Sequence, residues 1–273
     1  MNPRISVVTP AHNQGEKLLQ SYAGLLTQTV TDWEWIVVDD GSTESVEALL
    51  APMGDDRIRV RTLPKRRGQG AARNAGLEIA RGALVANQDP GDWSLPQRFE
   101  MQLGRLEAEP DLAAVGTFMF AAIPGMDVAL WRSYEDAMIH PSLMLRKDVF
   151  ATVSYDPRRK VGEDLAFTRT VDEQFDWAYL DKPLAAHDAS SDLGFGHYAR
   201  TQWSAWKADS PSIRRAVGIV ARVGAFGLAR LLGKHRQLIR RRYNDITPDQ
   251  LADFAEAQRT VNAKLAELRA LSS

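Results

Sequence analysis

The 273-residue sequence contains no cysteine. This absence excludes disulfides, thiolate catalysis and zinc sites with cysteine ligands, and it is typical of a reducing compartment. No apolar run approaches the ~20 residues that a membrane span requires, and residues 1–5 hold no apolar segment of signal-peptide length. We therefore expect a cytoplasmic protein.

Strong net charge is also absent: the formal net charge is −1, so no global field favours nucleic acid. The charge is uneven, however, because residues 211–244 carry nine basic side chains and no acid. Such a stretch predicts helices that touch an anionic membrane surface, which would place the protein peripherally on the inner membrane face. Helices packed on a catalytic domain would show the same pattern. The nine are Arg214, Arg215, Arg222, Arg230, Lys234, Arg236, Arg240, Arg241 and Arg242.

Short apolar or β-branched runs at residues 5–9, 33–38 and 83–86 are too short for helices and predict buried parallel strands. Pro10 is expected to end the first strand. Amphipathic or capped segments separate these runs and predict helices over 17–28, from Ser42 or Thr43 to about 50, over 71–80 and from Pro96 to about 109. The alternation predicts an α/β fold with a mostly parallel sheet flanked by helices.

Two acids, Asp89 and Asp92, follow the run at residues 83–86 on a turn made by Pro90 and Gly91. In open α/β sheets, ligands bind at the carboxyl ends of strands, so these acids are candidates to bind a sugar hydroxyl or a phosphate-bound metal. Taken alone, the turn would be read as an ordinary surface turn. The acids Asp39-Asp40 at another strand end, with Arg73 after a glycine-rich turn, complete a crevice shaped for a nucleotide.

Five segments in order resemble the motifs of family 2 glycosyltransferases, which have the GT-A fold. They are Pro10-Ala11-His12-Asn13, Gln28-Thr29, Val37-Val38-Asp39-Asp40-Gly41-Ser42, Ala71-Ala72-Arg73-Asn74-Ala75-Gly76 and Asp89-Pro90-Gly91-Asp92-Trp93. The resemblance covers roughly residues 3–191. The dinucleotide-binding pattern Gly-x-Gly-x-x-Gly is missing after the first strand, which argues against that class of nucleotide site.

The resemblance implies an inverting transferase in which Asp164 of the pair Glu163-Asp164 is the general base and Glu163 orients the acceptor or its neighbour. Two acids in a first helical turn would also simply complement the helix dipole. The resemblance further implies contacts to the donor nucleotide from several residues, and it implies a metal site. The donor set is Pro10, His12, Asn13, Asp39, Asp40, Arg73, Asn74 and Asp89; the metal set is Asp89, Asp92 and His187.

The expected metal is a divalent cation, Mn²⁺ or Mg²⁺, although Gly91 stands where the family usually has its ligand aspartate. Arg73 and the basic residues 65–67 are the alternative counter-charge for a diphosphate. His187 could instead be a surface histidine. In the variable region that follows residue 120, Met126, Trp131 and Tyr134 are candidates for an acceptor pocket or for simple packing.

We expect a catalytic domain over residues 1–193 and a helical extension over 194–273, in which Trp203 and Trp206 close the donor site or anchor the extension. Residues 247–250 read as a capping box that opens a last helix. Apolar residues then recur at three-and-four spacing, which predicts a helix pair or a homodimer through 247–271. They are Leu251, Phe254, Val261, Leu265 and Leu268.

The sequence therefore predicts transfer of a sugar from a UDP-, GDP- or dTDP-linked donor to an acceptor hydroxyl. The acceptor could be a lipid-linked glycan, a polysaccharide or a small metabolite. One alternative is a catalytically silent protein that binds sugar nucleotides or serves as a scaffold. The other is a sugar-1-phosphate nucleotidylyltransferase, which would need a glycine-rich phosphate loop where Pro10-Ala11-His12-Asn13 stands.

Overall fold

The computed structural model describes residues 3–122, 129–131, 138–188 and 247–272. Within these ranges nine strands form one sheet, in the order β3-β2-β1-β4-β8-β6-β9-β5, with β7 paired to β6. The strands are β1 (Ile5–Ala11), β2 (Trp33–Asp39), β3 (Ile58–Thr62), β4 (Leu84–Asn87), β5 (Trp93–Ser94), β6 (Ala114–Ala122), β7 (Ala129–Trp131), β8 (Met144–Arg146) and β9 (Trp177–Asp188). The helices are α1 (Gly15–Leu26), α2 (Val46–Leu50), α3 (Gln69–Ile79), α4 (Arg98–Ala108), α5 (Glu163–Gln174) and α8 (Pro248–Ser272), with short 3-10 turns η1 (Ala51–Met53), η2 (His140–Ser142) and η3 (Lys147–Ala151).

The predicted α/β fold with a central sheet flanked by helices is confirmed, and the parallel pairing is concentrated in its first half. Strands β3, β2, β1 and β4 pair in parallel, because helices connect each of them to the next. Strand β8 then runs antiparallel to both β4 and β6, and β9 is parallel to β6 but antiparallel to β5. The sheet is therefore mixed beyond β4.

Strand β1 does not stop at Pro10 as expected but continues to Ala11. The carbonyl of Val8 accepts a hydrogen bond from Gln88 on the β4 side, and the carbonyl of Ala11 accepts one from Asp40 on the β2 side. Alternation puts the nitrogen of Pro10 on the β4 side, beyond the last β4 residue that pairs. No ladder bond is lost there, so proline is tolerated.

The expected helix caps also need correction. Ser45, not Ser42 or Thr43, caps α2: its Oγ accepts from the amide of Ala48 at 3.1 Å. Ser42 and Thr43 instead bond to Asn13 in the loop after β1. Helix α4 likewise begins at Arg98 rather than at the proline before it. The local chemistry of serine and threonine permits either use, and the tertiary partner decides between them.

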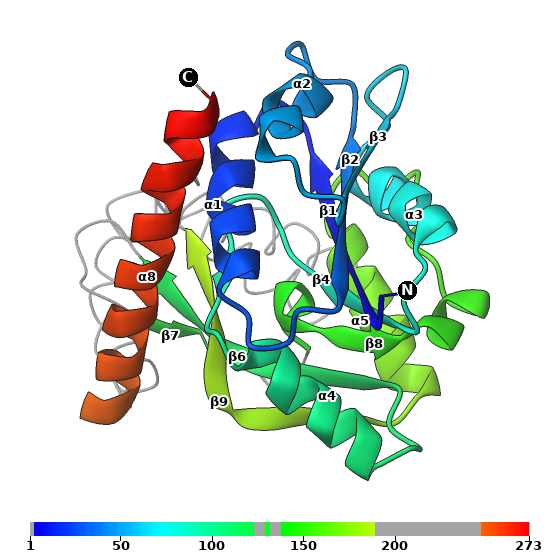
Figure 1. Cartoon of the computed structure of the whole chain (residues 1–273). Coiled ribbons are helices and arrows are strands. Elements are labelled where there is room, and N and C mark those ends of the chain that lie inside the picture. Colours follow the sequence, from blue (N-terminus) through cyan, green and yellow to red (C-terminus); the bar gives the residue numbers. More distant parts are fainter. Residues whose placement is uncertain (1–2, 123–128, 132–137, 189–246, 273) are drawn as a thin grey trace, which may run out of the picture.

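The helices cover the two faces of the sheet as layers (Figure 1). Side chains of β2 alternate between these layers: Trp35 and Val37 join a core that includes α1, α4 and α8, while Ile36 and Val38 pack against α3. Helix α5 packs on the same side as α3, in a third cluster with β6 and β8. The predicted residues of the donor site lie at or near the carboxyl ends of β1, β2 and β4 and at the start of α3.

The last helix, α8, lies beside α1 (Figure 1). Its capping box is present: the amide of Gln250 donates to Thr247 Oγ1 and the amide of Thr247 to Gln250 Oε1. The ring of Phe254 packs 5.4 Å from that of Trp93 and 4.6 Å from that of Phe120. The expected helix pair therefore forms within the chain, between α1 and α8. Of the five apolar residues that predicted it, Leu251 is exposed and the other four are buried. A homodimer through 247–271 stays a prediction.

Several expectations fall outside the described residues. They concern the domain boundary after residue 193, the basic stretch 211–244, Met126, Tyr134, Trp203, Trp206 and the side chain of Trp131. Among the helices that the structure does describe, none combines the length and apolarity needed to cross a membrane.

Replacing Phe254 by alanine should lower the free energy of unfolding by about 3–5 kcal/mol, because a buried aromatic side chain is removed between Trp93 and Phe120. Chemical denaturation of the full chain measures this. Leu251→Ala on the exposed face of the same helix is the matched control and should cost much less. Equal effects of the two substitutions would contradict the packing described for α8.

Candidate active site

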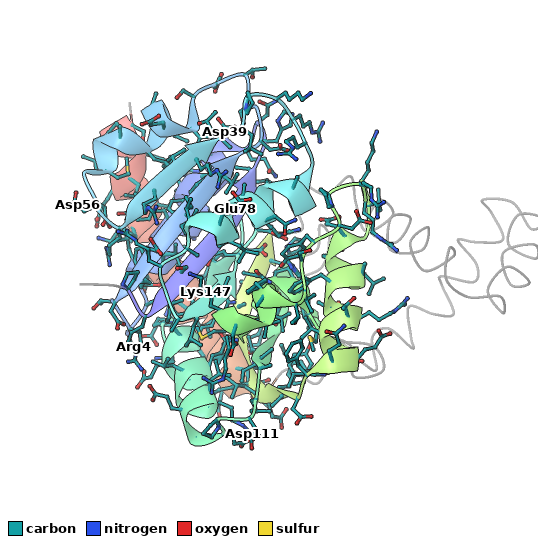
Figure 2. The ribbon with its side chains drawn as sticks, turned by 90° about the vertical axis from the view of Figure 1, so that its right-hand side faces the viewer. Arg4, Asp39, Asp56, Glu78, Asp111 and Lys147 are labelled. Atoms are coloured by element: carbon teal, nitrogen blue, oxygen red, sulfur yellow. The ribbon has the colours of Figure 1, made fainter. Side chains whose placement is uncertain are left out.

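The acids singled out from the sequence lie at one end of the sheet. Figure 2 shows Asp39, at the end of β2, far from Arg4, which precedes β1, and from Lys147, which follows β8. Asp89 and Asp92 follow β4, the parallel neighbour of β1, so they lie at the same end as Asp39. The expectation that the strand ends carry the acids is therefore met.

Asp39 and Asp40 are both buried and hold neighbouring loops. The two carboxylate oxygens of Asp40 accept the amides of Arg67 at 2.6 Å and Gly68 at 2.7 Å. Asp39 accepts the amide of Ser42 at 2.9 Å. Both acids thus shape the loops that would enclose a nucleoside, and their contact with base and ribose stays a prediction.

Glycine is required between these loops. Gly41 has a φ of 72°, and a Cβ there would lie 2.7 Å from the backbone nitrogen of Arg66. The chain after β2 therefore passes directly against the loop that precedes α3. Only a residue without a side chain permits this approach.

The loop after β1 is held against the loop after β2 by hydrogen bonds. His12 Nδ1 lies 3.0 Å from the carbonyl oxygen of Asp40, an arrangement in which the ring nitrogen donates. Asn13 takes the left-handed conformation with a φ of 55°, and its side-chain oxygen accepts from the amide and hydroxyl of Thr43. The segment that carries Pro10, His12 and Asn13 at the end of β1 thus lies against the segment that carries Asp39 and Asp40 at the end of β2.

Arg73, expected at the nucleotide, is 2% exposed and lies between two acids from distant segments. Its Nη1 donates to Glu163 Oε1 at 2.9 Å and its Nη2 to Asp89 Oδ1 at 2.8 Å. Burial opposes ionisation of Asp89, but the adjacent guanidinium holds the pKa of that carboxyl below its ordinary value. The turn after β4 and the start of α5 are therefore joined through one buried cation.

Asn74, also expected at the nucleotide, forms hydrogen bonds through its side-chain amide to the backbone of Tyr155. Its Nδ2 donates to the carbonyl of Tyr155 at 2.7 Å and its Oδ1 accepts the Tyr155 amide at 3.1 Å. The Tyr155 ring stacks on Phe167 of α5 with centroids 4.2 Å apart. Asn74 therefore positions the segment that leads into α5.

Glu163 and Asp164 open α5 as predicted, after Gly162 in the left-handed conformation. Glu163 is buried against Arg73, while Asp164 is half-buried and accepts the amide of Leu165 at 2.8 Å. Burial, and secondly the neighbouring Glu163, raise the pKa of Asp164 above its ordinary value. A carboxylate with a raised pKa is a stronger base, which suits proton abstraction.

Asp92 and His187, both predicted metal ligands, lie together. Asp92 Oδ1 is 2.7 Å from His187 Nδ1, and the buried Oδ2 of Asp92 has no hydrogen-bond partner in the described structure. Burial raises the pKa of Asp92. Across the described ranges, no three histidine or acidic side chains converge as a ready-made metal cluster.

Gly91 has a φ of 92°, and its amide donates to Ser21 Oγ at 3.0 Å and to the Lys17 carbonyl at 3.1 Å. The turn that carries Asp89 and Asp92 is therefore anchored to α1 through the backbone, at the position where the family usually has a carboxylate. Ser21 occurs among the apolar residues of the buried face of α1. A polar residue at such a position indicates a buried hydrogen-bond partner, and the sequence therefore held a signal for this contact.

The burial of two polar residues, His140 and Arg98, was not predicted. His140 Nε2 lies 2.8 Å from Tyr155 Oη, and burial and nearby Arg73 lower the pKa of His140 to about 3. Arg98 is fully buried and donates to the carbonyl of Asn87 at 3.1 Å, and burial lowers its pKa to about 10. Arg98 pairs with Gln102 one turn later on the buried face of α4, a polar pair that the sequence could have revealed.

Comparisons with known proteins agree with this geometry. Residues 6–152 match the family described as Glycosyl transferase family 2. The chain is 29% identical over 160 residues to the succinoglycan biosynthesis protein ExoO of Rhizobium meliloti, covering 59% of this chain and 46% of that protein. It is 29% identical over 102 residues to the UDP-Glc:alpha-D-GlcNAc-diphosphoundecaprenol beta-1,3-glucosyltransferase WfgD of Escherichia coli, covering 37% of this chain and 40% of the relative. The matches thus span less than half the length of these two curated relatives.

Among solved structures, the fold is similar to that of residues 1–349 of TarS from S. aureus in complex with UDP-GlcNAc. The TM-score is 0.60 at 17% sequence identity, over 98% of this chain and 88% of that chain. At this identity the likeness concerns the fold, and it agrees with the mixed sheet and its covering helices.

Replacing Arg73 by glutamine should lower the free energy of unfolding by about 3–5 kcal/mol, because buried Glu163 and partly buried Asp89 lose their common cation. Denaturant unfolding at neutral pH measures this. Arg67→Gln, at an exposed position of the preceding loop, is the control and should change stability by less than about 0.5 kcal/mol. A small effect of Arg73→Gln would show that the two ion pairs do not hold the site together.

Proposed function

The chain belongs to glycosyl transferase family 2, and we propose on this basis that it transfers a sugar from a nucleoside-diphosphate sugar to an acceptor hydroxyl with inversion at the anomeric carbon. The donor would occupy the crevice bordered by the ends of β1, β2 and β4. The acceptor would approach from the start of α5.

One observation carries this proposal: Arg73 joins Asp89, after β4, to Glu163, at the start of α5. Asp89 belongs to the turn expected to face the donor sugar, and Glu163 stands next to the proposed base Asp164. The donor turn and the base are therefore held at one place by a buried pair of ion pairs. Direct displacement needs this juxtaposition of an acceptor hydroxyl and an anomeric carbon.

In the proposed step, Asp164 takes the proton of the acceptor hydroxyl while that oxygen attacks the anomeric carbon of the donor sugar. The bond between the anomeric carbon and the diphosphate oxygen breaks, and the nucleoside diphosphate leaves with the electron pair. Glu163 is held as an ion pair with Arg73, so Asp164 is the acid available for proton transfer. Its amide contact with Leu165 orients the carboxylate.

We propose a UDP-linked donor in the first instance. WfgD is named for a UDP-Glc donor, and the TarS structure contains UDP-GlcNAc. In this chain the nucleoside would be bordered by residues from the ends of β1 and β2: Pro10, His12, Asn13, Asp39 and Asp40. Arg73 would act indirectly by holding Asp89, and Asn74 by holding the backbone of Tyr155. GDP and dTDP donors remain alternatives for the same pocket.

A divalent cation, Mn²⁺ or Mg²⁺, fits the residues present. The buried, unpartnered Oδ2 of Asp92 and the carboxylate of Asp89 are hard oxygen ligands of the kind these ions prefer, and His187 lies against Asp92. When bound, the cation would neutralise charge on the leaving diphosphate. Because Gly91 supplies no carboxylate, we propose that diphosphate and water oxygens complete its coordination.

The composition and the basic stretch 211–244 also bear on where in the cell the protein works. We propose that the protein works in the cytoplasm, and that the basic stretch 211–244 holds it peripherally against the inner membrane face.

Asp164→Asn should lower kcat by about 10²–10⁴-fold and leave UDP affinity nearly unchanged, because the base is lost while the nucleoside pocket is kept. Turnover with a donor and acceptor panel, together with UDP calorimetry, measures both. Glu173→Gln, exposed on the same helix, is the control. Because the pKa of Asp164 is raised, the wild-type rate should fall with decreasing pH already above the range of an ordinary aspartate. Unchanged turnover of Asp164→Asn would exclude this base, and absence of transfer despite UDP binding would favour a silent binding protein.

Chelation should weaken donor binding if Asp92 helps to hold a cation. We expect the UDP affinity of the wild-type chain to fall by about tenfold or more when Mn²⁺ is replaced by excess chelator. Asp92→Asn should remove this difference, whereas Asp111→Asn, at an exposed position remote from Asp39 in Figure 2, should keep it. If the UDP affinity and the turnover of the wild-type chain are the same with Mn²⁺ and with excess chelator, basic side chains rather than a cation neutralise the diphosphate.

A further inference from the structure

Residues 158–161, here called the basic segment, precede α5 and have not yet been given a role. They are Arg158, Arg159, Lys160 and Val161, and all four are exposed. Arg158 pairs with Asp156, whose own side chain is 35% exposed. Within the described residues, Arg159 and Lys160 have no ion-pair partner. The segment therefore presents positive charge that the described part of the chain does not neutralise.

The position of the basic segment is set by contacts on both sides. On one side, Asn74 binds the backbone of Tyr155, and Gly70 approaches the carbonyl of Asp156 so closely that a Cβ there would lie 3.3 Å away. On the other side, Gly162 leads directly into Glu163 and its ion pair with Arg73. The basic segment is thus anchored next to the start of α5, which carries the proposed base Asp164.

The acids of the site do not account for these cations. Glu163 and Asp89 are already neutralised by buried Arg73, and Asp164 accepts a backbone amide. A neutral sugar acceptor needs no cation at this place. Exposed basic side chains in a row, next to an enzyme's acceptor side, instead suit the oxygens of a phosphate group.

The fourth residue adds an apolar contact. Val161 is 46% exposed, and within the described residues only Leu251 and Leu271 of α8 are comparably exposed large hydrophobic side chains. Val161 adjoins Lys160 and lies two residues before Glu163. An apolar surface beside cations matches a ligand whose phosphate is joined to an alkyl chain.

We propose that the basic segment binds an acceptor that carries a phosphate or diphosphate between its sugar and an apolar chain. Arg158, Arg159 and Lys160 would contact the phosphate oxygens, and Val161 the first part of the chain. This inference rests on the proposed glycosyl transfer, whose acceptor it narrows from any hydroxyl compound to phosphate-linked glycosides. The reaction is unchanged: the acceptor hydroxyl still loses its proton to Asp164, and the phosphate of the acceptor is not transferred.

The first test compares matched acceptors with the full chain. Each pair shares the sugar and an octyl chain, joined either directly as a glycoside or through a diphosphate. We expect the diphosphate acceptors to show a kcat/KM higher by about tenfold or more, since charge-assisted hydrogen bonds to phosphate add affinity of that order. Equal kcat/KM values for the two kinds of acceptor would overturn the proposal and leave glycosyl transfer standing.

The second test uses the triple variant R158Q/R159Q/K160Q. It should raise KM for the diphosphate acceptors by about tenfold or more, with kcat and the donor KM changed much less. The control R4Q/K147Q/R259Q removes the same charge from exposed positions, of which Arg4 and Lys147 lie remote from Asp39 in Figure 2, and it should keep the preference for diphosphate acceptors. Loss of the preference in both variants would show a long-range charge effect and overturn the local assignment.

A third measurement does not depend on turnover. Octyl diphosphate is titrated into the full chain by calorimetry with UDP at saturation, so that the donor pocket is filled, and binding should be lost in R158Q/R159Q/K160Q. Failure of the wild-type chain to bind octyl diphosphate would overturn the proposal. Binding only to phosphatidylglycerol vesicles, lost in the same variant, would overturn it in favour of a membrane surface. Failure to bind UDP or any sugar nucleotide would instead count against the proposed function.

Discussion

The active-site end of this protein depends on one buried cation. Arg73 on α3 binds partly buried Asp89 after β4 and buried Glu163 at the start of α5, and without Arg73 both acids would lose their counter-charge. Three elements from separate parts of the chain are therefore fixed relative to one another by a single guanidinium. Asn74, the next residue on α3, repeats the connection through the backbone of Tyr155. The turn after β4 and the start of α5 share this support.

Much of the first half of the fold could be predicted because its signals are local. The runs in β1, β2 and β4 are short and apolar, and the acids that follow them sit on turns whose residues favour turning. Acids at strand ends meet at one edge of a parallel sheet, so Asp39, Asp40 and Asp89 could be placed together in advance. The position of the pair Glu163-Asp164 at a helix start was also predicted from its own stretch of sequence, where the two acids follow Gly162.

What the sequence could not reveal depends on partners far away in the chain. Nothing local distinguishes an arginine that binds a nucleotide from one buried between two acids, and so the partners of Arg73 were not foreseen. Ser42 and Ser45 have equal capping chemistry, and only the contact of Ser42 with Asn13 decides which one caps α2. Strand β8 spans three residues between 3-10 turns, and so short a strand carries no local signal for the direction of its pairing. Its antiparallel pairing with β4 and β6 was therefore not predicted.

The pairing of α1 with α8 has a consequence for the order of folding. Every described strand except β1 is synthesised between these two helices. The side of α1 that contacts α8 and the ring of Trp93 are therefore covered only when α8, the last described element, has left the ribosome. Contacts between chain regions so distant in sequence close late, because loop closure must precede them. Until then the early part of the chain exposes apolar surface, which is a substrate for chaperones and a risk for aggregation. The packing around the turn after β4 is thus completed only after the sheet and its other helices have been synthesised.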